Sequence, residues 1–511
     1  MKSLVLDGRS LSLSAFEPIF AGEPVELSIA PAAALAVERA RALVERHIAA
    51  GDVIYGLTTG FGKLKSVAIA AEDLVELQRN LVLSHCCGVG EPMPRFEVRA
   101  AQVCRLNGLL RGHSGVKLAT CEALVRFFAK GFVPVVPQQG SVGASGDLAP
   151  LAHMAAAYLG YGEAWVGDRR MPAADALRSI GESPLELGAK EGLALINGTE
   201  VMKAIGVGVL LRAVNVSKAA DAIASLSIEA LLGSVKPFDA RFAELKGHPS
   251  HARVADNVRR CLADSRVLES HANCDRVQDP YSLRCVPQVH GAWKAALEHV
   301  LSVFAHELNS VTDNPLIFPD TDEVVSAGQF HGQPISVPLD YLALAFCSIA
   351  NISERRVEQL VNPDLSRLPA FLVKKPGLHS GMMIAQVAAA SLASENKSLA
   401  HPASVDSIPT SANQEDHVSM GVTAARKARA ICANVENILA IEWLCAAQAH
   451  DFHCELRAGR GAQAAFECLR AHVPTLDGDR YLHSDIEKAR ELLVSGELVR
   501  RVEAAAGALS A

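Results

Sequence analysis

The sequence predicts a mainly α fold, in which a bundle of long helices follows a smaller N-terminal α+β region that carries loops. Half of the 511 residues are hydrophobic but only 5% are aromatic, so alanine, leucine and valine must fill most of the core. In the second half of the chain, apolar residues recur at helical spacing over stretches of up to about six turns. Consecutive helices of that length indicate a bundle in which each helix is buried along much of its surface.

The N-terminal region alternates short elements with loops. Residues 4–29 alternate apolar runs with turn residues and predict a small pair of strands. Pro31 suits the first position of a helix, and helical patterns return over residues 71–80 and 96–110. Two loops rich in glycine, at residues 55–62 and 134–147, interrupt these helices. We expect residues 1–196 to form this region.

Long helices dominate the rest of the chain, residues 197–511. Apolar stripes predict helices over residues 292–310, 342–361, 382–398 and 425–448. Pro363 is expected to end the second of these, because proline cannot continue a helix. We find no internal repeat and no low-complexity linker, so the sequence predicts one helical body after residue 196.

Charge and hydropathy exclude several classes of protein. The chain has 49 Lys+Arg against 56 Asp+Glu, and this small negative balance argues against a nucleic-acid-binding protein. Lys2, Asp7 and Arg9 precede any long apolar run, unlike a secretory signal. The most apolar windows, residues 341–350 and 438–449, fall short of the roughly 18 residues that span a bilayer. We therefore expect a cytoplasmic protein with no membrane segment.

Cysteine spacing and the common catalytic templates give negative results. The 12 cysteines are scattered, and the one close pair is Cys86-Cys87, so neither a zinc knuckle nor a dithiol redox motif is indicated. Templates for phosphate loops, dinucleotide binding, serine-hydrolase elbows and zinc proteases each fail at a required position. The sequence predicts no metal site.

One loop carries a specific signature. It reads Gly140-Ser-Val-Gly-Ala144-Ser145-Gly146-Asp147-Leu-Ala-Pro150, a tight turn followed by a helix with Pro150 in its first turn. This run resembles the signature of the aromatic amino acid ammonia-lyases, the family of histidine and phenylalanine ammonia-lyases. In that family the Ala-Ser-Gly triplet cyclises and dehydrates by itself to 4-methylideneimidazol-5-one (MIO). The resemblance implies that this cofactor forms from residues 144–146 and that no external cofactor is required.

The chemistry of ring formation explains the residue types. The amide nitrogen of Gly146 must reach the carbonyl carbon of Ala144, so neither flanking residue can be bulky, and glycine lets the backbone bend. Ser145 then loses its hydroxyl as water and leaves an exocyclic methylene, an electrophile that no ordinary side chain supplies. A helix that begins just after the loop would direct backbone N–H groups at the ring and favour electron flow into it.

Further blocks similar to this family follow in the same order over residues 50–490. They are Tyr55–Gly62, Asn80–Gly88, Leu195–Thr199, Gln278–Cys285, Thr312–Pro315 and Gln329–Gly332. The resemblance implies a helical core like that of fumarase and aspartase. It also implies a homotetramer in which each active site takes loops from three subunits.

The resemblance implies elimination of the α-amino group and a β-hydrogen from an amino acid, which gives an α,β-unsaturated acid and ammonia. Tyr55 matches the base that takes the β-proton, and Arg284 matches the guanidinium that binds the substrate carboxylate. Asn197 matches an amide that bonds either that carboxylate or the MIO carbonyl. The expected catalytic residues are Tyr55, Ala144, Ser145, Gly146, Tyr281 and Glu415, and the expected substrate-binding residues are His85, Asn197, Gln278, Arg284 and Phe330.

Glu415 indicates the substrate. It lies in a run, residues 394–421, that is closely similar to bacterial histidine ammonia-lyases, and phenylalanine and tyrosine ammonia-lyases usually have Gln at its position. A carboxylate can accept an imidazole N–H, whereas beside a benzene ring it would be buried without a partner. Ser84-His85 also resembles the histidine enzymes, although some bacterial tyrosine ammonia-lyases share it. We therefore expect L-histidine to be converted to trans-urocanate.

Several departures from the histidine-lyase pattern leave alternatives open. Thr58 replaces an Asn, residues 332–334 read Gly-Gln-Pro as in the tyrosine and phenylalanine enzymes, and His379 and Met382 replace an Asn and a Phe at the expected edge of the pocket. A tyrosine or phenylalanine ammonia-lyase and an MIO-dependent aminomutase are the alternatives within the family. A non-catalytic binding or assembly protein with this fold is a third.

Overall fold

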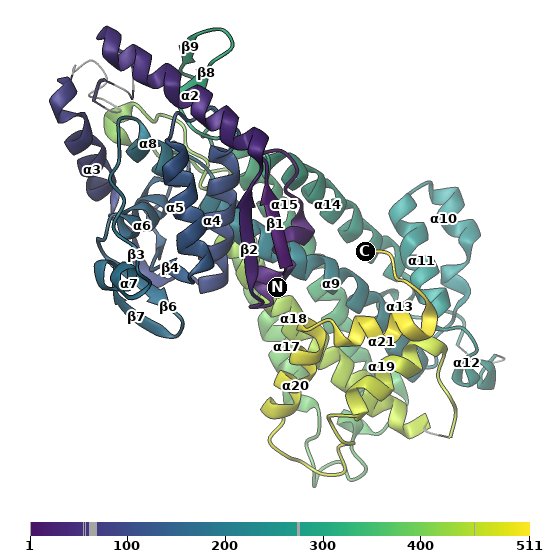
Figure 1. Ribbon diagram of the computed structural model, residues 1–511. Coiled ribbons are helices and arrows are strands. Elements are labelled where there is room, and N and C mark those ends of the chain that lie inside the picture. The colour runs from purple at the N-terminus through teal and green to yellow at the C-terminus, as the bar shows by residue number, and fades with distance from the viewer. Residues whose placement is uncertain (1, 55, 57, 61–68, 273–275, 454) are drawn as a thin grey trace. The chain divides into compact units, whose positions relative to one another are not determined.

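The computed structural model describes residues 2–54, 56, 58–60, 69–272, 276–453 and 455–511, which form two compact units (Figure 1). Unit 1 contains Met1–Gly208, Leu301–Asp340 and Pro402–Arg426, and unit 2 contains Val209–Val300, Tyr341–His401 and Lys427–Ala511. Each unit collects segments that are far apart in the sequence. The expected regions instead meet at one point, between residues 196 and 197, and that boundary stays a prediction.

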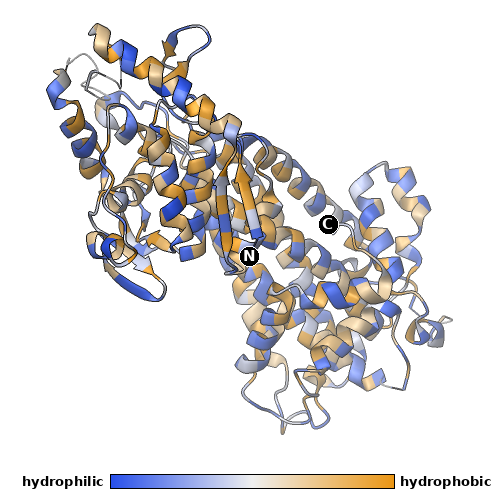
Figure 2. Cartoon of the chain, in the orientation of Figure 1, coloured by the Kyte–Doolittle hydropathy of each residue, from blue (hydrophilic) through white to orange (hydrophobic). Residues whose placement is uncertain are grey.

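Unit 1 begins with the expected strand pair. Strands β1 (Lys2–Leu6) and β2 (Val25–Ile29) pair in parallel, and the short helices η1 (Leu13–Phe16) and α1 (Glu17–Phe20) connect them. Helix α2 (Pro31–Ala50) follows with Pro31 at its first position, as predicted. Figure 2 shows hydrophilic and hydrophobic residues mixed along α2, and its buried face packs on Ile317 of the hairpin β8 (Leu316–Phe318) and β9 (Glu323–Val325).

Three helices of unit 1 contact one another in pairs and support the loop that carries residues 144–146. They are α3 (Leu74–His85), α6 (Leu148–Tyr158) and α8 (Glu191–Ile196). Short strands flank them: β4 (Phe132–Pro134), β6 (Glu163–Val166) and β7 (Arg169–Pro172) form one antiparallel sheet, and β3 (Val89–Pro92) pairs with β5 (Pro137–Gln139). The remaining helices of unit 1 are α4 (Arg95–Leu109), α5 (Leu118–Ala129) and α7 (Ala173–Ser179).

The long helices confirm the mainly α class. They are α9 (Glu200–Ala230), α14 (Val286–Glu307), α15 (Gln333–Val361), α17 (Met383–Leu399) and α18 (Gly421–His450). Four of them coincide with the predicted stripes, and α9 begins close to the point where long helices were expected to take over. Most residues of α9 are buried around its whole circumference, as expected for a helix that is apolar on all sides.

Shorter helices complete unit 2. They are α10 (Ala240–Lys246), α11 (Pro249–Cys261), α12 (Arg266–Ser270), α13 (Tyr281–Arg284), α16 (Pro363–Ser366), α19 (Arg460–Arg470), α20 (His483–Val494) and α21 (Glu497–Ala506). Helix α19 packs against α21 and α11. Helix α13 carries two of the predicted site residues, Tyr281 and Arg284, at its two ends.

Two helices correct the expectation that no apolar stretch is long enough to span a bilayer. By length and composition alone, α15 and the segment Gly421–His453 could each cross a membrane. The windows of residues 341–350 and 438–449 underestimated the length of these apolar helices, because each helix continues on both sides of its window. However, 61% of the most apolar window of α15 and 78% of that of Gly421–His453 are buried inside the protein, as in the core helices of a globular protein.

Candidate active site

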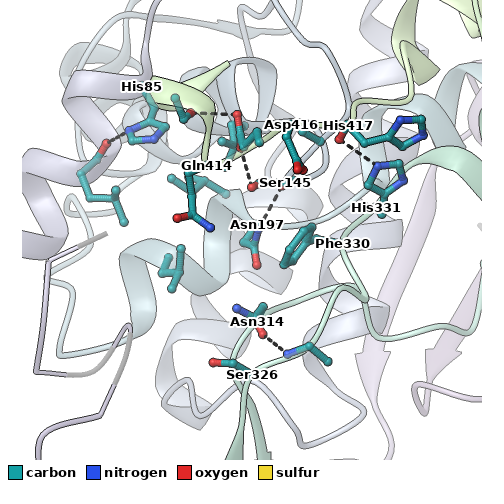
Figure 3. Close-up of a pocket in the computed structure, with 18 residues that line it drawn as sticks. His85, Ser145, Asn197, Asn314, Ser326, Phe330, His331, Gln414, Asp416 and His417 are labelled. Atoms are coloured by element: carbon teal, nitrogen blue, oxygen red, sulfur yellow. Dashed lines mark hydrogen bonds between the residues drawn. The ribbon is translucent and has the colours of Figure 1, made fainter. Parts of the chain in front are cut away.

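Unit 1 contains a cavity of about 700 Å³ beside Ser145 (Figure 3). Its wall comes from the end of α3, the start of α6, the end of α8, and the segments 314–331 and 411–417. Six of the predicted site residues line this cavity. They are His85, Ala144, Ser145, Asn197, Phe330 and Glu415.

The loop before α6 holds Ser145 at the cavity wall. Gly146 has a positive φ of 73°, and its backbone forms a β-bridge with Gly198. A Cβ atom on Gly146 would lie 2.0 Å from the carbonyl oxygen of Gly198, so only glycine fits there. The next amide, of Asp147, donates to the same oxygen at 2.6 Å. The triplet therefore ends in a backbone contact that excludes any side chain.

Asn197 is aimed at the carbonyl of Ser145. Its Nδ2 donates to that oxygen at 3.0 Å, and the residue is only 3% exposed. Its Oδ1 is buried and has no hydrogen-bond partner among the described residues. The buried Arg105 donates to the Asn197 carbonyl at 3.0 Å and fixes the backbone. The amide therefore polarises the Ser145 carbonyl, while its bond to the substrate carboxylate or to the MIO carbonyl stays a prediction.

Glu415 contacts Ser145 directly. Its Oε1 accepts from the Ser145 hydroxyl at 2.7 Å, and its Oε2 accepts from the hydroxyls of Thr410 at 2.6 Å and Ser411 at 2.8 Å. Partial burial opposes ionisation, but the hydrogen bonds from Thr410, Ser145 and Ser411 and the proximity of His85 lower the pKa of Glu415 below its usual value. The cavity therefore contains an ionised carboxylate beside the loop.

His85 is the last residue of α3, and its ring is oriented by its own helix. Its Nδ1 lies 2.8 Å from the Leu81 carbonyl, which can only accept, so Nδ1 donates to that carbonyl. Figure 3 shows His85 and Asn197 as separate parts of the cavity wall. The cavity thus presents an imidazole nitrogen, an amide and a carboxylate.

Asp147 is buried and caps the next long helix. Its Oδ2 accepts from the amides of Val201 at 2.9 Å and Met202 at 2.8 Å in the first turn of α9. Burial raises its pKa to about 7; the amide of Met202 opposes this and Glu200 adds to it. The side chain that follows the triplet is therefore fixed to α9 within unit 1.

Tyr55 lies outside the described residues, but the next residue, Gly56, packs against a residue of the cavity wall. A Cβ atom on Gly56 would lie 2.9 Å from Leu193, which lines the cavity. Thr58, which departs from the family pattern, donates to the Asp52 carbonyl at 2.7 Å and accepts from the Ile54 amide at 2.9 Å. Thr58 therefore closes this turn through its own hydroxyl.

The remaining predicted residues belong to unit 2. Gln278 and Arg284 line a different cavity of about 470 Å³, and Tyr281 is 70% exposed. The Arg284 guanidinium lies 4.5 Å from the centre of the Tyr281 ring, and among the described residues no carboxylate pairs with it. Within a single unit, the structure does not bring Gln278, Tyr281 or Arg284 to the cavity beside Ser145. His379 and Met382, expected at the pocket edge, also belong to unit 2 and do not line that cavity.

Sequence reasoning missed several residues of the wall. Asn314, His331, Gln414, Asp416 and His417 all line the cavity. The rings of His331 and His417 stack 5.5 Å apart. Each residue lies within or beside a block already identified, so adjacency was the available signal, but only the fold shows which neighbours face inward. In the described part of the chain, no group of three or more His, Cys, Asp or Glu residues could hold a metal ion.

Comparison with known proteins places the chain among lyases. A sequence model of the aromatic amino acid lyase family matches residues 11–471. Histidine ammonia-lyase from Myxococcus xanthus is 52% identical over 504 residues, which covers 98% of this chain and 99% of the relative. The crystal structure of histidine ammonia-lyase from Trypanosoma cruzi superposes with a TM-score of 0.92 at 40% identity, covering 99% of this chain and 95% of that one. Tyrosine aminomutase from Streptomyces globisporus has a TM-score of 0.92 at 36% identity, covering 98% and 99%.

Proposed function

The chain belongs to the aromatic amino acid lyase family, and on that premise we propose that it eliminates ammonia from L-histidine to give trans-urocanate. It is a carbon–nitrogen lyase with the fold of the histidine and phenylalanine ammonia-lyases. The observation that carries the choice of substrate is the ionised Glu415 in the cavity beside Ser145. We further propose that the enzyme acts in the cytoplasm.

The residues around Ser145 fit an MIO group made from Ala144, Ser145 and Gly146. Ala144 is buried and small, Gly146 has the left-handed backbone that a tight ring closure needs, and Asn197 donates to the carbonyl that the ring would keep. When formed, the ring supplies an electrophilic methylene at the cavity wall. Asn197 withdraws electron density from that carbonyl by its hydrogen bond, and α6 begins directly behind the loop.

Glu415 and His85 suit the imidazole of the substrate. An ionised carboxylate accepts an imidazole N–H, and a charge-assisted hydrogen bond of this kind is stronger than one between neutral groups. His85 adds an imidazole ring to the same wall, and its Nε2 remains available to a ligand because Nδ1 donates to Leu81. A phenyl or phenol ring would leave part of this set without a partner.

Two further roles lie outside the cavity as described. We propose that Tyr55 takes the β-proton, since a phenol near its unperturbed pKa of about 10 can serve as a base when cationic groups favour its ionised form. We propose that Arg284 binds the substrate carboxylate, with Gln278 and Tyr281 beside it. No Lys or Arg is among the described residues that line the cavity at Ser145, so an anchor must come from elsewhere.

A shared active site would supply that anchor. We propose a homotetramer in which Arg284 of one subunit serves the Ser145 cavity of another. The exposed Tyr281 and the unpaired Arg284 guanidinium support this proposal, because both offer polar groups that no described residue of their own unit satisfies. The substrate is a small amino acid, and the proposal requires no nucleic acid or membrane partner.

The test is a side-by-side product assay without added cofactor. Purified protein is incubated with L-histidine, L-tyrosine or L-phenylalanine, and urocanate, coumarate and cinnamate are followed by absorbance. We expect urocanate to form fastest, and Ser145→Ala to abolish its formation. Faster coumarate or cinnamate formation would instead favour a tyrosine or phenylalanine ammonia-lyase, and a β-amino acid product would favour an aminomutase, as the likeness to tyrosine aminomutase allows.

A further inference from the structure

Ser419 is a fully buried residue that contacts the loop of Ser145 from behind, away from the cavity. Its hydroxyl donates to the Gly143 carbonyl at 2.8 Å and accepts from the Gly421 amide at 3.2 Å. Its own amide donates to the Val142 carbonyl at 3.2 Å. Ser419 therefore bonds both peptide carbonyls that precede Ala144.

The fit around the Ser419 hydroxyl is close. A Cβ atom would lie 2.2 Å from its Oγ if placed on Gly143, and 2.5 Å if placed on Gly332. The Gly332 amide also donates to the Gly143 carbonyl, at 3.1 Å. Two glycines thus let the hydroxyl and one amide converge on a single carbonyl oxygen, which fixes the position of the peptide that leads into Ala144.

The other end of the triplet is held independently. The Asp147 amide donates to the Gly198 carbonyl at 2.6 Å, and the Asp147 carboxyl accepts from the first amides of α9. The three residues between these anchors are those that cyclise under the proposed function. The Gly146 nitrogen bonds to the Ala144 carbonyl carbon. The Ala144 oxygen leaves as one water with the amide hydrogens of Gly146 and Ser145, and a C=N bond forms between the Ala144 carbon and the Ser145 nitrogen. Ser145 then loses its Hα and its hydroxyl as a second water, which leaves the exocyclic methylene. No oxidant or co-reactant is required.

We propose that Ser419 is a positioning residue for this ring closure, a role that rests on the proposed function. Ser419 holds the Gly143 peptide while Gly198 holds Asp147, so the backbone of the triplet is restricted before the ring closes. Ring closure then costs less conformational entropy. Ser419 touches neither the cavity nor the substrate, so it acts before the first turnover and not during it.

The test follows maturation by intact mass. Wild-type chain and Ser419→Ala are made by cell-free synthesis, and the loss of two water molecules is timed by mass spectrometry. We expect Ser419→Ala to mature about tenfold more slowly, which corresponds to one buried neutral hydrogen bond worth about 1.4 kcal/mol. Once corrected for the fraction of mature chains, its kcat and KM should equal those of the wild type.

Ser336→Ala is the matched control. Ser336 is also fully buried, and its hydroxyl donates at 2.6 Å to the carbonyl of Ser419, but among the described residues it makes no hydrogen bond to residues 140–147. The two variants lose comparable hydrogen bonds in the same region, so a general weakening would slow both. We expect only Ser419→Ala to mature slowly, and Ser419→Cys, with a weaker donor, to be intermediate.

The outcomes separate this inference from the proposed function. A wild-type chain that never loses two waters would refute the MIO proposal itself. A wild type that matures while Ser419→Ala matures at the same rate would overturn the role of Ser419 alone, as would equal slowing in Ser336→Ala. Should Ser419→Ala prove insoluble, Ser419→Cys decides, and maturation at the wild-type rate again overturns the inference.

Discussion

Glu415 determines substrate preference in our proposal, and its replacement by Gln isolates the charge. Gln can still accept a hydrogen bond, but it loses the charge-assisted contact with imidazole, worth about 1.5–3 kcal/mol. We expect Glu415→Gln to lower kcat/KM for L-histidine by about ten- to a hundredfold. Turnover of L-tyrosine or L-phenylalanine, if present, should fall much less. Steady-state assays on the three amino acids measure the difference.

Asp416→Asn is the control for this prediction. Asp416 lines the same cavity next to Glu415 but is exposed. Its replacement removes an equal charge without touching Ser145, so histidine turnover should change by less than threefold, within the range of an exposed charge. Equal losses in both variants would mean that Glu415 acts only through the general field of the cavity.

His450 makes the stability of the protein depend on pH on the acid side. The residue is 2% exposed and lies edge-on to Phe466, and burial lowers its pKa from 6.5 to about 4, with His453 and Arg470 adding to the effect and Asp451 opposing it. The unfolded chain therefore binds a proton first as pH falls, so stability is lost between about pH 6.5 and pH 4. We expect His450→Gln to flatten the fall of Tm over that range.

Calorimetry at a series of pH values measures this slope. His472→Gln is the matched control, because His472 is exposed and lies in the same unit. Its slope should follow that of the wild type. If His450→Gln and the wild type lost Tm in parallel from pH 6.5 to 4, His450 would not be the responsible group.

Of the cavity wall, sequence reasoning identified residues that belong to distinctive blocks and missed contacts that depend on packing; the catalytic and binding roles stay predictions. Ala144, Ser145, Asn197 and Glu415 occur in patterns that few sequences share, and the structure places them around one cavity. Thr410 and Ser411 lie in the run of residues 394–421 that resembles the histidine enzymes, but nothing in that run shows that their hydroxyls donate to Glu415. Ser419 lies in the same run, but its contact with Gly143 spans 276 positions of the chain, a separation that no local pattern reveals.

Among the helices, Glu442 of α18 joins three elements within unit 2. Its fully buried carboxylate accepts from Arg356 of α15 at 2.5 and 2.9 Å, from Ser353 of α15 at 2.6 Å and from Ser227 of α9 at 2.7 Å. Arg356→Met would leave this charge without its cation. We expect a destabilisation of about 3–5 kcal/mol, seen as a large fall in Tm.

Two further variants test whether the loss of stability comes from the unpaired buried charge. The double variant Arg356→Met/Glu442→Met should recover much of the loss, because two apolar side chains leave no unpaired charge. Arg39→Met, in the exposed pair with Asp320, should change stability by at most about 1 kcal/mol. Similar effects of Arg356→Met and Arg39→Met would show that the buried pair contributes no more than a surface pair.

The elements themselves were predictable where periodicity is long. The stripe over residues 342–361 became α15, because about six turns of apolar spacing and a following Pro363 leave little alternative. Strands such as β8 and β9 have three residues each, too few for alternation to be distinguished from chance. The membrane-length apolarity of α15 was missed because the helix begins eight residues before the apolar window of residues 341–350 and continues beyond it.

For the whole molecule, a shared active site predicts complementation between inactive subunits. Ser145→Ala cannot form the ring, and Arg284→Met cannot bind the substrate carboxylate, so each variant alone should be inactive. Co-expressed, they form mixed tetramers in which some sites combine an intact Ser145 with an intact Arg284. We expect urocanate formation to return in the purified mixture, to a fraction of the wild-type rate.

Mixing the variants after separate purification is the control. If tetramers exchange subunits slowly, activity should return only after co-expression. A co-expressed mixture that stays inactive, while light scattering shows tetramers that contain both chains, would place Ser145 and Arg284 of the same chain in one site. A monomer in solution would exclude sharing altogether.

That one active site takes residues from several subunits could be predicted from the sequence only through its resemblance to the family. Arg284 and Ser145 are 139 positions apart, and nothing in their local patterns says whether they meet within one chain. In the structure they belong to different compact units, and each lines its own cavity. The number of subunits depends on how surfaces of separate copies pair. A local motif does not show this pairing, and neither does the structure of a single chain.

In the newly folded chain, the hydrogen bond from Ser145 to Glu415 blocks the proposed binding site for the substrate imidazole. The serine hydroxyl sits on the acceptor that we assign to the imidazole, and it leaves as water when the ring forms. Ser145→Ala removes the hydroxyl and so leaves Glu415 Oε1 free without ring formation. Isothermal titration calorimetry should therefore show that Ser145→Ala binds L-histidine, although this variant cannot convert it. Freshly folded wild-type chain should not bind L-histidine until the Ser145 hydroxyl has been lost.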